Sequence, residues 1–278
     1  TGDLERVRRM LRFLFGMPVL PVTVVVALMV GAHLVRSLVI PPLAWDSLLY
    51  HLVRPALWIQ ESGLYEYAAP GKWTHWSLFP PLGNSLSAWN MVLTSSDALL
   101  PLVWFGVWLL LVLGVYTLAR QLGASRVQAY LASLAGALIP AISAHIFVSY
   151  NDHPVAAVAI LSLVMLVYMA RRSSRAAGIL ALAALATGVA IKQTIAPFAG
   201  MGALALVYLV WRDDDLSLVG VALPAAAAAL LVAAPHYGFV WVETGSPIYP
   251  YGLEIGDWVI FEGRSETLFR GGLDEGRV

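Results

Sequence analysis

The sequence predicts an all-α, polytopic membrane protein with about seven transmembrane helices. Hydrophobic residues make up 59% of its 278 residues and charged residues only 12%, and the mean hydropathy is +0.76. Such a composition lies outside the range of soluble domains. Long apolar runs also approach the roughly 20 residues that a spanning helix needs. These runs are 18–40, 98–118, 127–148, 154–170, 176–191, 197–211 and 216–235.

The first run is interpreted as a retained transmembrane helix rather than a signal peptide. It begins near Met17 behind an Arg-rich segment, is too long for a signal-peptide core and has no small-residue cleavage motif. The runs 176–191 and 197–211 are short for full spans, so they are either two thin helices or a re-entrant pair. Both interpretations leave the later topology unchanged.

The distribution of arginine predicts the orientation. Arginines with no acid near the membrane lie before the first run and in the connections 119–126 and 171–175. The positive-inside rule makes these segments cytoplasmic, so 42–97, 149–153 and 236–250 lie outside. We therefore expect a multipass protein of the inner (plasma) membrane whose active site is extracytoplasmic.

An interfacial amphipathic helix is predicted at 46–54, within the first outer loop. Asp46, Tyr50 and Arg54 recur every four residues on its polar face. The opposite face is apolar and consists of Leu48, Leu49, Leu52 and Val53. Pro55 should kink or end this helix. The loop 42–97 is rich in Trp and Tyr, which is typical of the bilayer interface, so the polar face should lie over a cavity.

Composition also excludes several classes of protein and site. The net charge is zero and no Lys/Arg-rich stretch suggests nucleic-acid binding, so no nucleic-acid partner is expected. The chain has no cysteine, which excludes disulfides and thiol catalysis. We divide it into a transmembrane module at 1–250 and a polar tail at 251–278 whose composition is typical of disorder.

Two aspartates are candidate catalytic residues at the outer face. Asp46 is either the N-cap of the amphipathic helix or a general base beside Tyr50 and His51, since a carboxylate suits deprotonation of a hydroxyl. Asp152 either caps the helix that begins near Pro154 or belongs to the same site. Their common depth favours one shared site.

Lys192 lies between two apolar runs on the outer side, where an unpaired cation is costly. It is either a snorkelling lysine or a ligand for a phosphate or pyrophosphate, together with Arg54 or His153. The predicted substrate-binding residues for lipid phosphate and sugar are Tyr50, His51, Arg54, Asn151, His153, Lys192 and His236.

The histidines do not predict a metal site. His33 and His145 lie within apolar runs and are interpreted as helix-packing residues. Other histidines and acids could supply ligands, but no HExxH or comparable spacing is present. We therefore expect no cofactor, although a divalent metal stays open.

Several short motifs resemble membrane glycosyltransferases of the GT-C superfamily. The resemblance is to the bacterial branch related to protein O-mannosyltransferases and the lipid A aminoarabinose transferase. It covers roughly residues 17–250 and rests on Trp45–His51, Trp58-Ile-Gln, Phe79-Pro-Pro-Leu-Gly, Tyr150-Asn-Asp, Gly188–Thr194 and Thr244–Pro250.

This resemblance implies a conserved seven-helix module, a polyprenyl-phosphate-linked sugar donor and transfer to an acceptor at the non-cytoplasmic face. The family's acid in the first outer loop matches Asp46, its second acid Asp152, and its basic residue after the fifth helix Lys192. The chain departs from its relatives in having fewer helices. Its pair of aspartates also differs from the Asp-Glu forms, which puts metal dependence in doubt.

We therefore predict a cell-envelope hexosyl- or pentosyltransferase with Asp46 as general base and Lys192 as ligand of the departing lipid phosphate. The acceptor is a glycan, lipid or protein. Two alternatives remain open: a transporter or flippase for lipid-linked sugars, and a non-catalytic membrane subunit that helps a partner enzyme.

Overall fold

A computed structural model describes residues 4–5, 8, 19–40, 44–64, 78–213 and 216–263, which form helices joined by short connections and one hairpin. Its elements are α2 (Leu20–Val39), the π-helical η1 (Ser47–His51), α3 (Val53–Gln60), α4 (Leu82–Thr94), α5 (Leu100–Gln121), α6 (Arg126–Ala137), α7 (Pro140–Ser143), α8 (Asp152–Arg172), α9 (Arg175–Ile191), the 3-10 helix η3 (Gln193–Ile195), α10 (Ala196–Arg212), α11 (Leu218–Val232), α12 (Ala234–Thr244), β1 (Leu253–Ile255) and β2 (Trp258–Phe261).

Four helical segments in the described ranges are long and apolar enough to cross a membrane: α2, α5, α8 and η3 with α10. A fifth arises if α11 and α12, which meet at a bend of 56°, count as one span, and α9 is a shorter apolar helix. The chain is thus a multipass membrane protein. The count of seven spans is not confirmed.

The predicted single helix over 127–148 is wrong. The helix α6 stops at Ala137, and Pro140 opens the separate short helix α7. Proline has no backbone N–H and its ring clashes with the preceding turn, so a helix cannot run through Pro140 undisturbed. Residues 144–151 then return to the start of α8 without regular helix.

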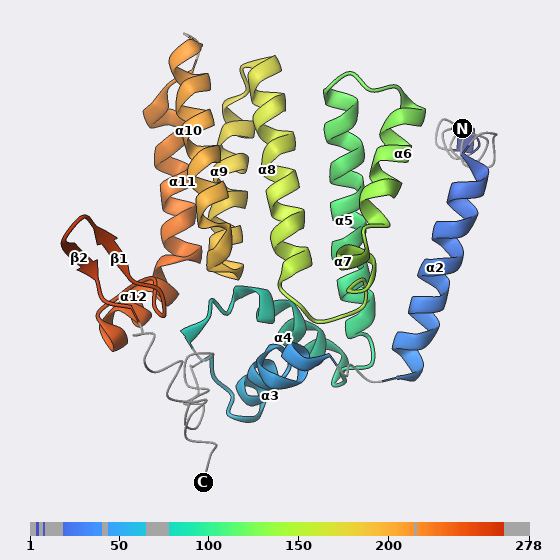
Figure 1. Ribbon diagram of the computed structural model, residues 1–278, viewed down its shortest axis with the longest axis horizontal. Coiled ribbons are helices and arrows are strands. Elements are labelled where there is room, and N and C mark those ends of the chain that lie inside the picture. Colours follow the sequence, from blue (N-terminus) through green and yellow to red (C-terminus); the bar gives the residue numbers. More distant parts are fainter. Residues whose placement is uncertain are drawn as a thin grey trace.

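Two clusters of buried side chains hold the helices together. One lies among α8, α9, α10 and α11 and includes Met169, Leu206 and Val221. The other includes Trp108 of α5 and Ile146, which follows α7. The helix α2 stands apart from the rest in Figure 1 and buries only Val26 within its length.

Three short helices lie at one end of the bundle, which we call the α3–α4 end. The helices α2 and α9 finish there, α5, α8 and α10 begin there, and α3, α4 and α12 lie across it (Figure 1). The opposite end carries most of the described arginines: Arg8, Arg120, Arg126, Arg171, Arg172, Arg175 and Arg212. The predicted sorting of arginines away from the candidate site is therefore present in the fold.

The predicted amphipathic helix at 46–54 is divided in two. The π-helical η1 ends at His51, and α3 continues to Gln60. Pro55 therefore does not end the helix; it lies in the first turn of α3, where its missing N–H needs no partner. The buried residues are Ser47, His51 and Arg54, so the polar side of this segment faces the protein.

A short hairpin lies at the start of the predicted tail. The strands β1 and β2 pair antiparallel there, with Leu253 opposite Phe261. Residues 264–278 lie outside the described residues, as do the predicted interface aromatics Tyr65, Tyr67, Trp73 and Trp76.

Candidate functional site

An ion pair joins two helices at the α3–α4 end. Asp152 lies in the first turn of α8 and Lys192 caps the end of α9. The Nζ atom of Lys192 lies 2.7 Å from Oδ1 of Asp152. The extended backbone of Lys192 (φ −155°, ψ 120°) stops α9 at this point and turns the chain toward η3. The pair therefore joins the near ends of α8 and α9.

Asp46 lies at the N-cap position of η1, but its side chain makes no capping hydrogen bond. Its backbone N–H donates to the Oη atom of Tyr150 at 3.3 Å. The carboxylate is thus not occupied as a cap, and the loop before α8 holds the backbone that carries it.

The electrostatics of Asp46 depend on the ion pair. Burial raises the pKa of Asp46, the charge of Lys192 lowers it, and the charge of Asp152 raises it. Asp46, Asp152 and Lys192 therefore lie close enough to influence one another. A carboxylate with a raised pKa is a stronger base than an ordinary aspartate.

A cavity of about 100 Å³, the Lys192 cavity, opens beside this pair. It lies between η1, the segment before α4, the start of α8 and the junction of α9 with α10. Its walls include Tyr50, His51, Phe79, Asn151, Lys192 and Tyr251. Four predicted substrate-binding residues thus share one cavity.

His51 and Tyr50 face this cavity as uncharged groups. The Nδ1 atom of His51 lies 3.0 Å from Oδ1 of Asn84, and because an amide oxygen only accepts, Nδ1 carries the proton. Burial disfavours the charged form of each group. It therefore lowers the pKa of His51 to about 4 and raises the pKa of Tyr50. Near neutral pH both side chains therefore make hydrogen bonds without adding charge to the cavity wall.

Arg54 lies behind the cavity rather than on its wall. It is fully buried, and its Nη1 donates to the carbonyl oxygen of Phe79 at 3.0 Å. Arg54 thereby holds the segment before α4 against α3, and its charge lowers the pKa values of Tyr50 and His51.

Asn151 is held between three elements. Its Nδ2 donates to the carbonyl oxygen of Ile191 at 3.3 Å. A Cβ atom at Gly83 of α4 would lie 2.1 Å from its Oδ1, so only glycine permits this approach. Asn151 thus packs the start of α8 against the end of α9 and the start of α4.

His153 and His236 are not among the residues lining the Lys192 cavity. His153 is buried, with its ring centroid 6.3 Å from that of His145. His236 is buried on α12 beside Tyr237, whose Oη donates to the carbonyl oxygen of Val189 in α9. Their roles as substrate ligands stay predictions.

Comparison with known proteins identifies the family. The sequence profile of the dolichyl-phosphate-mannose-protein mannosyltransferases matches residues 80–239, which is more than half of the chain. The chain belongs to this family. Neither the curated proteins nor the solved structures contain a match.

Membership in the dolichyl-phosphate-mannose-protein mannosyltransferase family confirms the resemblance to the GT-C superfamily. It identifies the chain as a membrane glycosyltransferase, from a family that uses lipid-linked sugar donors. The matched range includes Asn151, Asp152 and Lys192, whereas Asp46 and η1 lie before it.

Several residues of this family member's site were not assigned a role from sequence. Gln193 and Thr194 line the cavity and belong to the Gly188–Thr194 motif, whereas Tyr251 lies in the predicted tail. Tyr150 and Asn84 act through contacts with Asp46 and His51. Of these two residues, only Tyr150 belongs to a motif of the sequence, Tyr150-Asn-Asp, so only its contact with Asp46 could be anticipated.

The described residues contain no group of three or more His, Asp or Glu side chains that could hold a metal ion. The two candidate aspartates are instead associated with the Lys192 ammonium, through an ion pair for Asp152 and through charge for Asp46. The expectation that no cofactor is needed stays a prediction.

Proposed function

We propose that this family member transfers a sugar from a polyprenyl-phosphate donor to an acceptor hydroxyl at the extracytoplasmic membrane face. The observation that carries the proposal is that Asp46 feels the charges of Asp152 and Lys192, and that Lys192, paired with Asp152, lines the cavity. A base and a phosphate ligand in one place are what such a transfer requires.

The donor phosphate binds at Lys192. Its ammonium lines the cavity, and the partial exposure of Lys192 and Asp152 leaves it open to exchange with a ligand. A charged hydrogen bond from Nζ stabilises the negative charge that accumulates on the phosphate oxygen as the bond to the sugar breaks. Tyr50 and Asn151 lie on the same walls and contact the sugar.

Asp46 deprotonates the acceptor. Its carboxylate takes the proton of the acceptor hydroxyl while the oxygen forms a bond to the anomeric carbon. The bond between that carbon and the phosphate oxygen breaks, and its electron pair leaves with the polyprenyl phosphate. The raised pKa of Asp46 favours this proton transfer. The single displacement, which inverts the anomeric carbon, is taken from the resemblance.

One assay distinguishes a transferase from a flippase and from a non-catalytic subunit. Purified protein is incubated with a radiolabelled polyprenyl-phosphate sugar and with acceptors of the glycan, lipid and protein classes. Transfer is expected from the wild type, and Asp46→Asn should lower it by about a hundredfold or more. Asp97→Asn, in the exposed connection between α4 and α5, is the matched control and should retain full transfer.

Donor binding without transfer by the wild type would favour a flippase or a non-catalytic subunit. Full activity of Asp46→Asn would exclude Asp46 as the base. Because Asn caps helices about as well as Asp, a loss of helix capping does not explain a loss of activity in this variant.

The proposed location is the inner (plasma) membrane, with the α3–α4 end outside, because arginines gather at the opposite end. The chain has no cysteine, so single cysteines can be labelled selectively. Ser96→Cys at the α3–α4 end should react in intact cells, and Leu122→Cys at the other end only after lysis. The reverse pattern would overturn the orientation.

A further inference from the structure

A second and larger cavity, the α2 cavity, lies between α2, the start of α5 and the segment after α7. Its volume is about 290 Å³, close to the lower limit of roughly 300 Å³ for small-molecule sites. His33, Arg36 and Ser37 line it from α2, and Pro101, His145 and Val148 line it from the other side.

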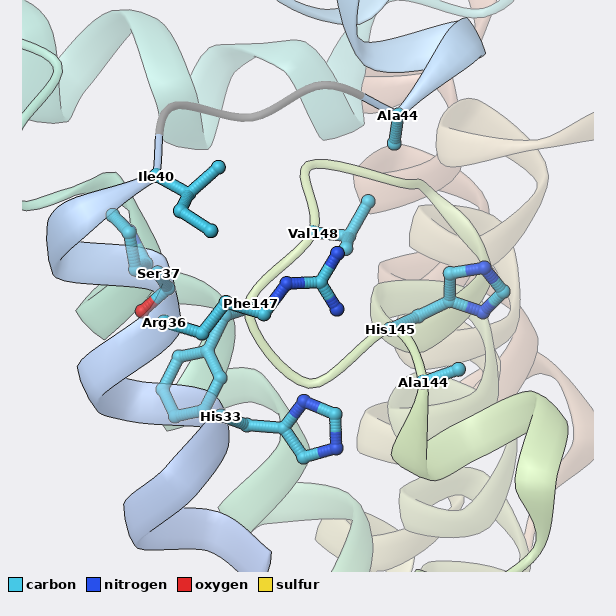
Figure 2. Close-up of a pocket in the computed structure, with 10 residues that line it drawn as sticks. His33, Arg36, Ser37, Ile40, Ala44, Ala144, His145, Phe147 and Val148 are labelled. Carbon is cyan, nitrogen blue, oxygen red and sulfur yellow. The ribbon is translucent and has the colours of Figure 1, made fainter.

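The polar part of this cavity is rich in groups that bind anions. Figure 2 shows the Arg36 guanidinium and the His33 ring extending from α2 into the same space, with His145 on the opposite wall. Among the described residues, no acidic side chain lines this cavity. No described acidic side chain forms an ion pair with Arg36 either. A guanidinium with two imidazoles and no carboxylate suits a phosphate group.

The place of Arg36 in the chain also needs explanation. It lies in the last turn of α2, at the α3–α4 end, away from the arginines at the opposite end. In the proposed orientation this is the outer end, where the positive-inside rule does not favour arginine. A cation beside lipid at such a depth is stabilised by an anionic partner.

The α2 cavity is connected to Asp46. Ala44 lines it and lies two residues before Asp46, whereas Tyr50, farther along the same segment, lines the Lys192 cavity. The His145 ring lies 5.0 Å from the Tyr150 ring, and the Tyr150 hydroxyl accepts the Asp46 N–H. The segment that carries the proposed base therefore runs from one cavity to the other.

His145 is oriented by its own helix turn. Its Nδ1 lies 2.7 Å from the carbonyl oxygen of Ala141, and since a carbonyl only accepts, Nδ1 carries the proton. This bond fixes the ring on the cavity wall. His145 therefore lines a cavity whose described walls carry no acidic side chain, rather than only packing between helices.

We propose that the α2 cavity binds the phosphate group of a phosphate-bearing acceptor, with Arg36 as principal ligand and His33 and His145 as further ligands. This inference rests on the proposed transfer function, because it makes the cavity the acceptor side of Asp46. Ile40, Phe147 and Val148 supply apolar walls for an amphiphile.

Binding of three probes in detergent tests the proposal: dioctanoyl phosphatidic acid, dioctanoylglycerol, which lacks the phosphate, and inorganic phosphate. The wild type should bind phosphatidic acid at least about tenfold more tightly than dioctanoylglycerol, and Arg36→Gln should remove this difference. Arg36→Lys should restore part of it. Arg126→Gln, a matched change at the other end of the bundle, should leave it unchanged.

Inorganic phosphate that binds as tightly as phosphatidic acid, with the same dependence on Arg36, would identify a soluble phosphate compound as the source. Weaker binding of inorganic phosphate would identify a lipid headgroup. Either result supports the site. An unchanged preference for phosphatidic acid in Arg36→Gln, or equal binding of dioctanoylglycerol by the wild type, would overturn it.

The same measurement in two other variants separates this inference from the proposed function. Asp46→Asn and Lys192→Ala should both keep Arg36-dependent binding of phosphatidic acid, because neither residue lines the α2 cavity. If binding depends on Lys192 and not on Arg36, the phosphate occupies the donor side and the α2 cavity is not a phosphate site. Loss of transfer with retained Arg36-dependent binding would contradict only the transfer function.

Discussion

The Nζ atom of Lys192 lies 2.7 Å from Oδ1 of Asp152, which joins the end of α9 to the start of α8. Their side chains are 36% and 57% exposed, so the pair contributes little to stability. Its value is positional: it holds a cation at the wall of the Lys192 cavity and leaves that cation exchangeable with a phosphate oxygen.

The first prediction concerns donor affinity. Lys192→Ala should weaken binding of a short-chain polyprenyl phosphate by about tenfold or more, the usual loss for a charged hydrogen bond. Lys192→Arg should keep most of the affinity because it preserves the charge. Binding in detergent, with the matching polyprenol as control, measures both. A snorkelling lysine would tolerate both changes, and unchanged binding in the Ala variant would mean that Lys192 does not bind the donor phosphate.

The pH dependence of transfer provides a second prediction. A general base must be ionised, so kcat/KM falls as pH drops through the pKa of Asp46. Burial raises that pKa, which places the acidic limb above the ordinary value of 3.8. Asp152→Asn removes a charge that raises the pKa and should move the limb to lower pH. Lys192→Ala removes a charge that lowers it and should move the limb to higher pH.

These opposite shifts are specific to Asp46. A general loss of folding would lower the rate without moving the limb in two directions. Asp97→Asn should leave the limb in place, and a limb that neither Asp152→Asn nor Lys192→Ala moves would rule out Asp46 as the titrating base.

Sequence patterns predicted the class of fold and the end of the bundle that carries the site. Apolar runs near 20 residues and one-sided arginines reflect the bilayer itself, so they are visible without tertiary structure. The helix break at Pro140 was also visible in principle, but the apolar run through it concealed the break. Hydropathy measures burial in lipid and does not detect a lost backbone hydrogen bond.

Contacts between distant segments could not be predicted in the same way. The bond from His51 to Asn84 and the approach of Gly83 to Asn151 depend on how α4 crosses the bundle. The division of 46–54 at Leu52 follows from burial of Ser47 and His51 against the protein. A helical repeat of four residues in the sequence does not contain that packing information.

Tyr150 should act as a positioning residue for Asp46. Tyr150→Phe removes the hydroxyl that accepts the Asp46 N–H at 3.3 Å, so kcat should fall by about tenfold while donor affinity stays close to wild type. Tyr130→Phe is the matched control, since it removes a hydroxyl 2.7 Å from Oγ1 of Thr23, away from the site. Equal effects of the two changes would mean that Tyr150 serves only general packing.

The final prediction tests the close approach of α4 to α8. Gly83→Ala places a Cβ atom 2.1 Å from Oδ1 of Asn151, so the Asn151 side chain must move and lose its bond to Ile191, the residue before Lys192. We expect transfer to fall by about ten- to a hundredfold, since small displacements of positioning groups have effects of this size. Gly106→Ala, in α5, meets nothing within 4 Å and should retain activity.

A double variant decides whether the loss passes through Asn151. If the clash is the cause, Gly83→Ala should have little further effect once Asn151→Ala has removed the obstructing atoms, so the two losses will not add. Additive losses would show that Gly83 acts independently of Asn151. Gly83→Ala in α4 and its control Gly106→Ala in α5 each replace glycine by a residue of higher helix propensity. A rate that falls in Gly83→Ala alone therefore cannot come from a weakened helix.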